Sequence, residues 1–231
     1  MLTLTDINSF YGRSHVLHGV SLQVPARQVT ALLGRNGTGK TTLLKSLMGL
    51  TDRMTGEIHL RDRELAREPS YVRARAGIAY VPQGREIIPD FSIRENILMG
   101  TFARADGKRI IPDLVGVLFP YLTANMDRPG GLLSGGQQQQ LAIARALAAD
   151  PSVLLLDEPT EGIQPSVVEE IEQVVSRLIR DAGLTVVLVE QNLAFARRAG
   201  HRFAIMEKGR VVAAGHMSEL TGDLIHRHLA V

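Results

Sequence analysis

The stretch GRNGTGKT, residues 34–41, constrains the fold of this chain more than any other part of its sequence. It follows the apolar run QVTALLG (28–34), typical of a buried strand, and precedes TTLLKSLMGL (41–50), whose leucines share one helical face. Its three glycines let the backbone curve so that several N–H groups point at phosphate oxygens, and the helix adds its positive end. The sequence therefore predicts a strand–loop–helix unit that binds a nucleoside triphosphate. A glycine-rich turn with an exposed lysine is the disfavoured alternative.

Within this loop, Lys40 is expected to reach the β- and γ-phosphates, and the Thr41 hydroxyl is expected to ligate Mg²⁺. The residues assigned to the nucleotide are Gly34, Arg35, Asn36, Gly37, Thr38, Gly39, Lys40, Thr41 and Thr42.

An acidic pair ends a second buried strand, in SVLLLDEP (152–159). Asp157 is predicted to hold Mg²⁺ directly or through water, and Glu158 to polarise an attacking water. A helix cap before Pro159 would explain one acid but not two.

Hydrophobic patterning predicts an α/β fold. Antiparallel strands are expected at 2–7 and 15–25, a further strand at 56–60, a buried strand at 76–83 and another strand at 184–191. A helix is expected at 165–183, and a hairpin over 202–215 that turns at Lys208–Gly209. Between about 85 and 149 the strand signals vanish, and helices are expected at 92–100, 109–122 and 136–150. Strands that alternate with helices imply a parallel sheet covered on both faces, with the helical middle as an inserted lobe.

Composition narrows the possible partners. The absence of cysteine excludes disulfides and thiolate metal sites, and scattered basic residues with only 4% aromatics argue against nucleic acid as the main partner. No apolar run approaches the roughly 18 residues that span a bilayer, and the first residues do not resemble a secretory signal. A soluble protein is expected, which would meet a membrane only through a partner.

The stretch LLSGGQQQQLAIARAL (132–147) combines glycines and a glutamine run with a helical period. Ser134 and the N–H groups of Gly135 and Gly136 predict an anion-binding helix N-terminus, with Gln137 in the first turn. The buried stripe is expected at Leu141, Ala144, Leu147 and Ala148. A low-complexity tract is the alternative, but the repeat is only four residues long and continues the helical period.

In this order, GRNGTGKT, YVPQ, LSGGQ and LLLDEPT resemble the nucleotide-binding subunits of ATP-binding cassette (ABC) transporters, and the resemblance covers essentially the whole chain. It implies an ATPase that uses ATP and Mg²⁺. The implied fold is a P-loop NTPase with a RecA-like parallel-sheet core, an N-terminal antiparallel β subdomain and an inserted helical subdomain. One domain, 1–231, would comprise the core and β subdomain at 1–84 and 150–231 and the helical signature subdomain at 85–149.

The resemblance also implies that two subunits pack head to tail, so that Ser134, Gly135, Gly136 and Gln137 of one cap the γ-phosphate held by the other. Tyr11 matches the aromatic residue that stacks on adenine, although it could be a strand tyrosine packed in a small sheet. Gln83 matches the glutamine that senses Mg²⁺ and joins the two lobes; a plain loop glutamine is the alternative. The EGIQP loop (161–165) occupies the position of the family segment that contacts the opposite subunit, but it lacks the usual serine-alanine-leucine-aspartate sequence.

One position departs from the family pattern. About 33 residues after Glu158, where the family usually has a histidine that contacts the γ-phosphate, LVEQN (188–192) has Gln191. A glutamine amide can donate a hydrogen bond to phosphate but cannot carry a proton. The catalytic set is therefore Lys40, Glu158 and Gln191, with the role of Gln191 left open. His201 is interpreted as a surface histidine.

The segments VEQN (189–192) and TEGIQP (160–165) resemble the ATPases of branched-chain amino acid and urea uptake systems. The segments VPQGREIIP and, at the C-terminus, LIHRHLAV resemble the urea type more. The implied partners are a second ATPase subunit, identical or related, transmembrane permeases and, indirectly, an extracytoplasmic solute-binding protein. The implied location is peripheral, at the cytoplasmic face of the membrane.

Two rival functions are disfavoured. A cytosolic ABC-type ATPase acting on nucleic acid or ribosomes would carry a long coiled-coil insertion or a second cassette. A GTPase or small-molecule kinase would not account for LSGGQ.

Overall fold

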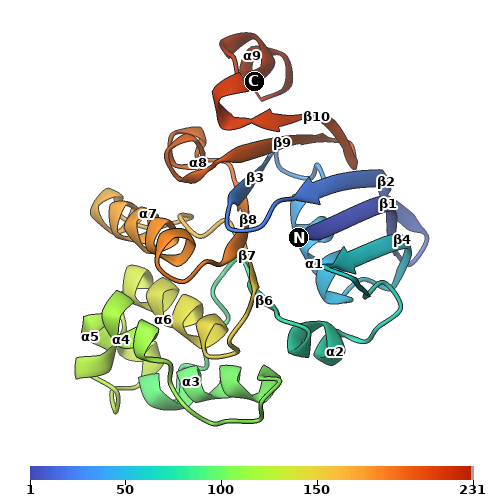
Figure 1. The fold of residues 1–231 in the computed structure, drawn as a ribbon. Helices are drawn as coiled ribbons and strands as arrows, with labels where there is room; N and C mark the ends of the chain where they lie inside the picture. The colour runs from blue at the N-terminus through green and yellow to red at the C-terminus, as the bar shows by residue number, and fades with distance from the viewer. Residues whose placement is uncertain (230–231) are drawn as a thin grey trace.

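A computed structural model of the chain describes residues 1–229, and a six-stranded sheet forms its centre (Figure 1). The strand order is β10-β9-β3-β8-β7-β6, parallel throughout except that β10 runs antiparallel to β9. The strands span Val29–Leu33 (β3), Ile78–Val81 (β6), Val153–Asp157 (β7), Thr185–Glu190 (β8), Arg202–Glu207 (β9) and Arg210–His216 (β10). The predicted hairpin turn at Lys208–Gly209 is confirmed.

The central strands are covered on both faces, which explains their continuous apolar runs. Every residue of β3, β7 and β8 is buried. In β7, Leu154 and Leu156 pack into a core with the helices of one face, whereas Val153 and Leu155 pack into a core with the other face.

An antiparallel sheet lies against one face of the central sheet, with helix α1 (Lys40–Met48) between them (Figure 1). Its order is β2-β1-β4-β5, with strands at Leu2–Tyr11 (β1), Ser14–Val24 (β2), Arg53–Leu60 (β4) and Arg63–Glu64 (β5). The His18 N–H donates to the Gly209 carbonyl over 2.9 Å, which joins this sheet to the β9–β10 turn. The predicted antiparallel strands are confirmed, and β1 and β4 are longer than expected.

Helices cover the opposite face. They are α3 (Ile93–Gly100), α4 (Asp113–Leu118), α5 (Pro120–Ala124), α6 (Gly135–Leu147) and α7 (Pro165–Arg180). Within residues 85–149 there are helices and no strand of either sheet. The single helix expected over 109–122 is wrong in detail: it begins after Pro112 and is divided at Phe119, because Pro120 cannot donate to a preceding turn.

Short helices complete the chain. They are α2 (Ser70–Arg75), α8 (Leu193–Ala199) and α9 (Gly222–His228), each of which spans two turns or fewer, and the sequence patterns did not predict α2 or α9. Short 3₁₀ turns lie at Thr101–Ala103 (η1), Gly130–Leu132 (η2) and Met217–Glu219 (η3). Among the described residues, no helix has the length and apolar character needed to traverse a bilayer.

Candidate functional site

Three adjacent parallel strands end at one edge of the sheet and bring the predicted site together. Strand β8 lies between β3 and β7, so Gln191 follows the middle strand, with the phosphate loop on one side and Asp157 and Glu158 on the other. A cavity of about 400 Å³ opens there. It is lined by Tyr11, Val16, Asn36, Gly37, Gly39, Lys40, Thr41, Thr42, Gln83, Glu158, Glu161 and Gln191.

Two glycines fix the shape of the phosphate loop. Gly34 has φ +154°, and a side chain there would collide with the Met206 carbonyl. Gly39, with φ +102°, caps α1 in a left-handed conformation and makes no side-chain cap bond, so the first-turn N–H groups are available to an anion. Arg35 and Thr38 do not line this cavity; together with Asn36 and Gly37 they line a neighbouring one beside α9.

Lys40 is buried beside the phosphate loop. Its Nζ donates to the Gly34 carbonyl at 2.8 Å and to the Arg35 carbonyl at 3.0 Å, and lies 3.8 Å from Oε1 of Glu158. Burial lowers the pKa of Lys40, whereas the nearby carboxylates, Glu158 foremost, raise it. The cavity therefore contains a cation held by backbone carbonyls and one flanking acid.

Asp157 is buried at the end of β7 and accepts two hydrogen bonds. Its Oδ1 accepts from the Thr41 hydroxyl at 3.1 Å, and its Oδ2 from the Tyr80 hydroxyl at 3.0 Å. Burial raises the pKa of Asp157, and the two hydroxyls partly offset this; burial also raises the pKa of Tyr80.

The pairing of the Asp157 carboxylate with the Thr41 hydroxyl suits a hard cation. Such oxygen atoms fit Mg²⁺, which is commonly bound by one or two protein oxygens together with water and substrate phosphates. Within residues 1–229, no cluster of three or more histidine, cysteine or acidic side chains could hold a metal ion. A metal at this position would therefore need a phosphate ligand as well.

Glu158 faces the cavity in a different direction from Asp157. Both of its carboxylate oxygens accept from the Gln191 amide nitrogen, at 2.7 and 2.8 Å. Its backbone has φ +48°, which is uncommon for a residue with a side chain, and its N–H donates to the Val189 carbonyl at 2.9 Å. Strand β8 therefore fixes both the backbone and the side chain of Glu158.

Tyr11 and Gln83 reach the same cavity from other elements. Tyr11 ends β1, and the Gln83 amide donates to Oε2 of Glu161 at 2.8 Å rather than to Asp157 or Thr41. The sequence analysis did not single out Glu161 or Tyr80. The signal that could have identified Tyr80 is its position three residues before Gln83, in the strand that pairs with β7.

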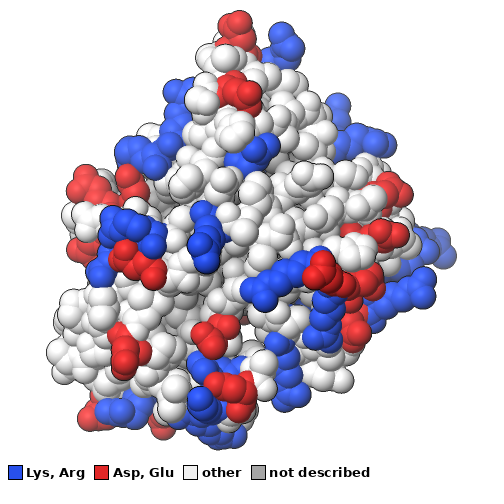
Figure 2. Space-filling view, viewed as in Figure 1, with Lys and Arg blue, Asp and Glu red and all other residues white. Residues whose placement is uncertain are grey.

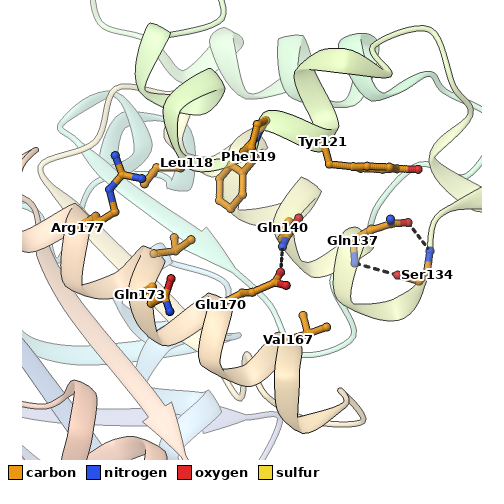
Figure 3. A pocket seen from close by; sticks show the side chains of 12 residues that line it. Leu118, Phe119, Tyr121, Ser134, Gln137, Gln140, Val167, Glu170, Gln173 and Arg177 are labelled. Atoms are coloured by element: carbon orange, nitrogen blue, oxygen red, sulfur yellow. Dashed lines mark hydrogen bonds between the residues drawn. The ribbon is translucent and has the colours of Figure 1, made fainter.

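The LSGGQ segment lies beside a different cavity. Ser134 caps α6: its Oγ accepts from the Gln137 N–H at 3.3 Å, and its own N–H donates to the Gln137 side chain at 3.0 Å. Both residues line a cavity of about 490 Å³ between α5, α6 and α7 (Figure 3). Its other lining residues are Leu118, Phe119, Pro120, Tyr121, Gln140, Val167, Glu170, Gln173, Val174 and Arg177.

Among the described residues, this cavity and the phosphate-loop cavity have no lining residue in common. Gly135 and Gly136 form the first turn of α6, and the stripe expected at Leu141, Ala144, Leu147 and Ala148 is buried as predicted. The structure thus brings together Tyr11, the phosphate loop, Gln83, Glu158 and Gln191, but not the LSGGQ segment.

His201 lies away from the site. Its Nδ1 accepts from the Val29 N–H at 3.2 Å, at the start of β3, whereas the phosphate loop follows the end of that strand. The side chain is exposed, in agreement with the interpretation as a surface histidine.

The sequence analysis missed a buried acid, Glu190, which ends β8. The same signal that identified Asp157, an acid that ends an apolar strand, is present in TVVLVE. Burial raises the pKa of Glu190, and hydrogen bonds from Thr160, Asn192 and Gln191 oppose that shift.

Comparison with known proteins agrees with this geometry. The family model described as ABC transporter matches residues 17–161. The high-affinity branched-chain amino acid transport ATP-binding protein BraG of Pseudomonas aeruginosa is 39% identical over 213 residues, covering 92% of this chain and 91% of BraG. A probable branched-chain amino acid transport ATP-binding protein, LivF of Archaeoglobus fulgidus, is 36% identical, covering 95% and 94%.

A solved structure, the dimer of an ATP-binding cassette in a post-hydrolysis state with ADP and Pi bound, superposes with a TM-score of 0.80 at 26% identity. The match covers 94% of this chain and 99% of that chain. The predicted α/β fold with a parallel-sheet core and an antiparallel N-terminal sheet is confirmed.

Proposed function

The chain belongs to the ATP-binding proteins of ABC transporters, ATPases that drive transport, and from that premise we propose that it is the ATP-hydrolysing subunit of an importer of a small solute. One observation carries the assignment of the site. Lys40, Glu158 and Gln191 meet in a single cavity, where the Gln191 amide contacts both oxygens of Glu158 and Lys40 lies 3.8 Å from one of them.

In this mechanism the protein positions charge around the terminal phosphate. The N–H groups of the loop and of the first turn of α1 bind phosphate oxygens, and Lys40 exchanges its carbonyl partners for the β- and γ-phosphates. Glu158 orients the attacking water and accepts its proton, and Gln191 holds the Glu158 carboxylate in place. Tyr11 stacks on the adenine.

Mg²⁺ would be held by Thr41, Asp157 and Gln83. When bound, it neutralises charge that develops on the phosphate oxygens. Tyr80 orients the Asp157 carboxylate from the other side, because its hydroxyl donates to the oxygen that Thr41 does not contact.

The separation of the two cavities supports a composite site. Ser134 lines a cavity distinct from that of Lys40, so a second ATPase subunit, identical or related, would bring its own α6 N-terminus to the phosphates held here. ATP would then close the pair, and hydrolysis would reopen it.

We further propose that residues 85–149 act as a helical subdomain that transmits this motion to transmembrane permeases, with residues 1–84 and 150–231 as the nucleotide-binding core. Met99 and Phe102 are 41% and 54% exposed beside a cavity of about 340 Å³. Apolar side chains exposed in this way suit a protein partner. The chain would act peripherally at the cytoplasmic face of the membrane, with a solute-binding protein as an indirect partner.

Nucleic acid is not proposed as a partner. Figure 2 shows basic and acidic side chains interspersed over one face of the molecule, rather than a continuous basic surface.

The solute is proposed to be urea, a short amide or a branched-chain amino acid. The similarity to BraG and LivF supports the amino acids, and the segment VPQGREIIP supports urea. The other segment of the urea resemblance, LIHRHLAV, ends at residues 230–231, outside the described residues. ATP turnover by the reconstituted transporter should rise with one of these solutes and its binding protein; stimulation by none would reject this class.

The substitution Glu158→Gln tests the site. It retains the shape and an oxygen that can accept a hydrogen bond from the water but removes the carboxylate that accepts its proton, so ATP turnover should fall at least about 100-fold with ATP affinity preserved. Glu172→Gln is the matched control, because within residues 1–229 the Glu172 side chain bonds only to Arg198, between α7 and α8. Turnover equal to that of the control would contradict the assignment of Glu158.

A further inference from the structure

Glu190 is a buried carboxylate that the mechanism above does not use. It is 2% exposed and ends β8. It lines a cavity with Gln191 and with residues 34–36 of the phosphate loop, but not the cavity that Lys40 and Glu158 line. It therefore does not contact the reacting atoms from this position. A buried charge is retained at such a position only when hydrogen bonds compensate for its lost hydration.

Four hydrogen-bond donors compensate for the lost hydration of the Glu190 carboxylate, two at each oxygen. Oε1 accepts from the Thr160 hydroxyl at 2.7 Å and from the Thr160 N–H at 3.2 Å. Oε2 accepts from the N–H groups of Gln191 and Asn192, each at 3.1 Å. All four groups are donors toward the carboxylate, so the arrangement suits an ionised acid that only accepts.

The two oxygens bind backbone on either side of the Gln191–Glu158 contact. Thr160 lies two residues beyond Glu158, and Oε2 holds the Gln191 N–H itself. The ring of contacts closes through the Gln191 amide, which donates to both oxygens of Glu158. A shift of either backbone segment would therefore move the amide relative to the carboxylate.

We propose that Glu190 is a positioning residue for hydrolysis, which fixes the loops of Thr160 and Gln191 so that the Gln191 amide holds Glu158 in its reactive orientation. This inference rests on the proposed role of Glu158. In this proposal, one buried carboxylate keeps the segment after β7 aligned with the segment after β8.

The substitution Glu190→Gln tests this role with little change in volume. An amide has one oxygen and one NH₂, so in either orientation its NH₂ faces backbone N–H donors that the carboxylate accepted from. The kcat for ATP should fall roughly 10- to 100-fold, because small displacements of catalytic groups cost about that much, while KM for ATP stays within about twofold. Glu172→Gln, which removes the same charge from α7, should leave both constants unchanged.

A Gln191→Ala background separates positioning from a general structural role. If Glu190 acts through Gln191, then Glu190→Gln should lower kcat by less than about twofold when Gln191 is already alanine. An equal loss of kcat in both backgrounds would overturn the proposal, as would a wild-type kcat for Glu190→Gln.

Thr160→Val is a milder substitution, because it removes only the hydroxyl that donates to Glu190. It provides a second test of the proposal if Glu190→Gln does not fold. It should lower kcat roughly 3- to 10-fold and speed amide exchange in residues 158–161 and 190–192. Unchanged kcat and exchange would overturn the proposal.

The role of Glu158 is judged separately. Wild-type turnover in Glu158→Gln would reject the proposed site itself, whereas loss of turnover there with normal turnover in Glu190→Gln would reject only this inference.

Discussion

Helices α1 and α6 both begin in glycine-containing turns, yet their N-termini are built differently. Gly39 caps α1 without a side-chain hydrogen bond, and the first turn of α1 holds the buried Lys40 together with Thr41, which bonds to the buried Asp157. Ser134 caps α6 in a reciprocal pair of bonds with Gln137. The charged side chains of its cavity, Glu170 and Arg177, come from α7 and are paired, with Gln140 and with Asp181. The charged chemistry is concentrated at α1, and α6 offers mainly neutral donors.

This difference suggests a division of labour. A site with its own buried cation and acids can bind nucleotide in a single chain, whereas an N-terminus without a buried cation is suited to complement phosphates held elsewhere. Damage at α1 should therefore weaken binding, and damage at α6 should weaken only hydrolysis by the pair.

The largest expected effect comes from Ser134→Arg. A bulky cation at the start of α6 would block approach of a second subunit, so ATP turnover should fall more than about 100-fold. Nucleotide binding by the isolated chain, measured by fluorescence titration, should stay within about twofold. Lys40→Ala is the matched contrast and should weaken binding by the isolated chain. Equal loss of single-chain binding in both variants would break the comparison.

A smaller effect is expected at the adenine end of the α1 cavity. Tyr11→Ala should lower the ATP affinity of the isolated chain about tenfold, because the stacking of a base on an aromatic ring contributes roughly 1–3 kcal/mol. Tyr11→Phe keeps the ring and should bind ATP normally. An unchanged affinity in Tyr11→Ala would assign Tyr11 to packing within its sheet.

The smallest effect concerns the packing of α6. A side chain on Gly136 would collide with Val167 of α7, so Gly136→Ala should lower the free energy of unfolding by about 1–2 kcal/mol. Adding Val167→Ala should recover part of that loss. At Gly135 a methyl group meets only the flexible end of Arg85, so Gly135→Ala should cost less. Equal costs in denaturant titrations of both single variants would contradict the close contact of α6 with α7.

Local patterns predicted most of the fold. The phosphate loop, the acid pair that ends β7 and the start of α6 each join an apolar strand or helix pattern to characteristic residues at its end. A short stretch of sequence was therefore enough to predict each of them. Helices α2 and α9 were missed because segments of six or seven residues carry too little periodicity.

The contacts within the site depend on the order of the strands in the sheet, which cannot be inferred from any short stretch of the sequence. Gln191 reaches Glu158 because β8 pairs with β7, and Tyr80 reaches Asp157 because β6 pairs with β7. Glu190 carried a readable signal, but its partners Thr160 and Asn192 become neighbours only in the folded sheet.

The central claim, that α6 of one subunit serves the phosphate loop of another, can be tested by disulfide trapping. Because the sequence contains no cysteine, Thr38→Cys and Ser134→Cys introduce the only thiols. The two chains, each also carrying Glu158→Gln and tags of different size, would be mixed, oxidised with and without ATP, and analysed by gel electrophoresis. The account predicts an ATP-dependent disulfide between the two differently tagged chains. Absence of a disulfide between the two chains in the presence of ATP would contradict it.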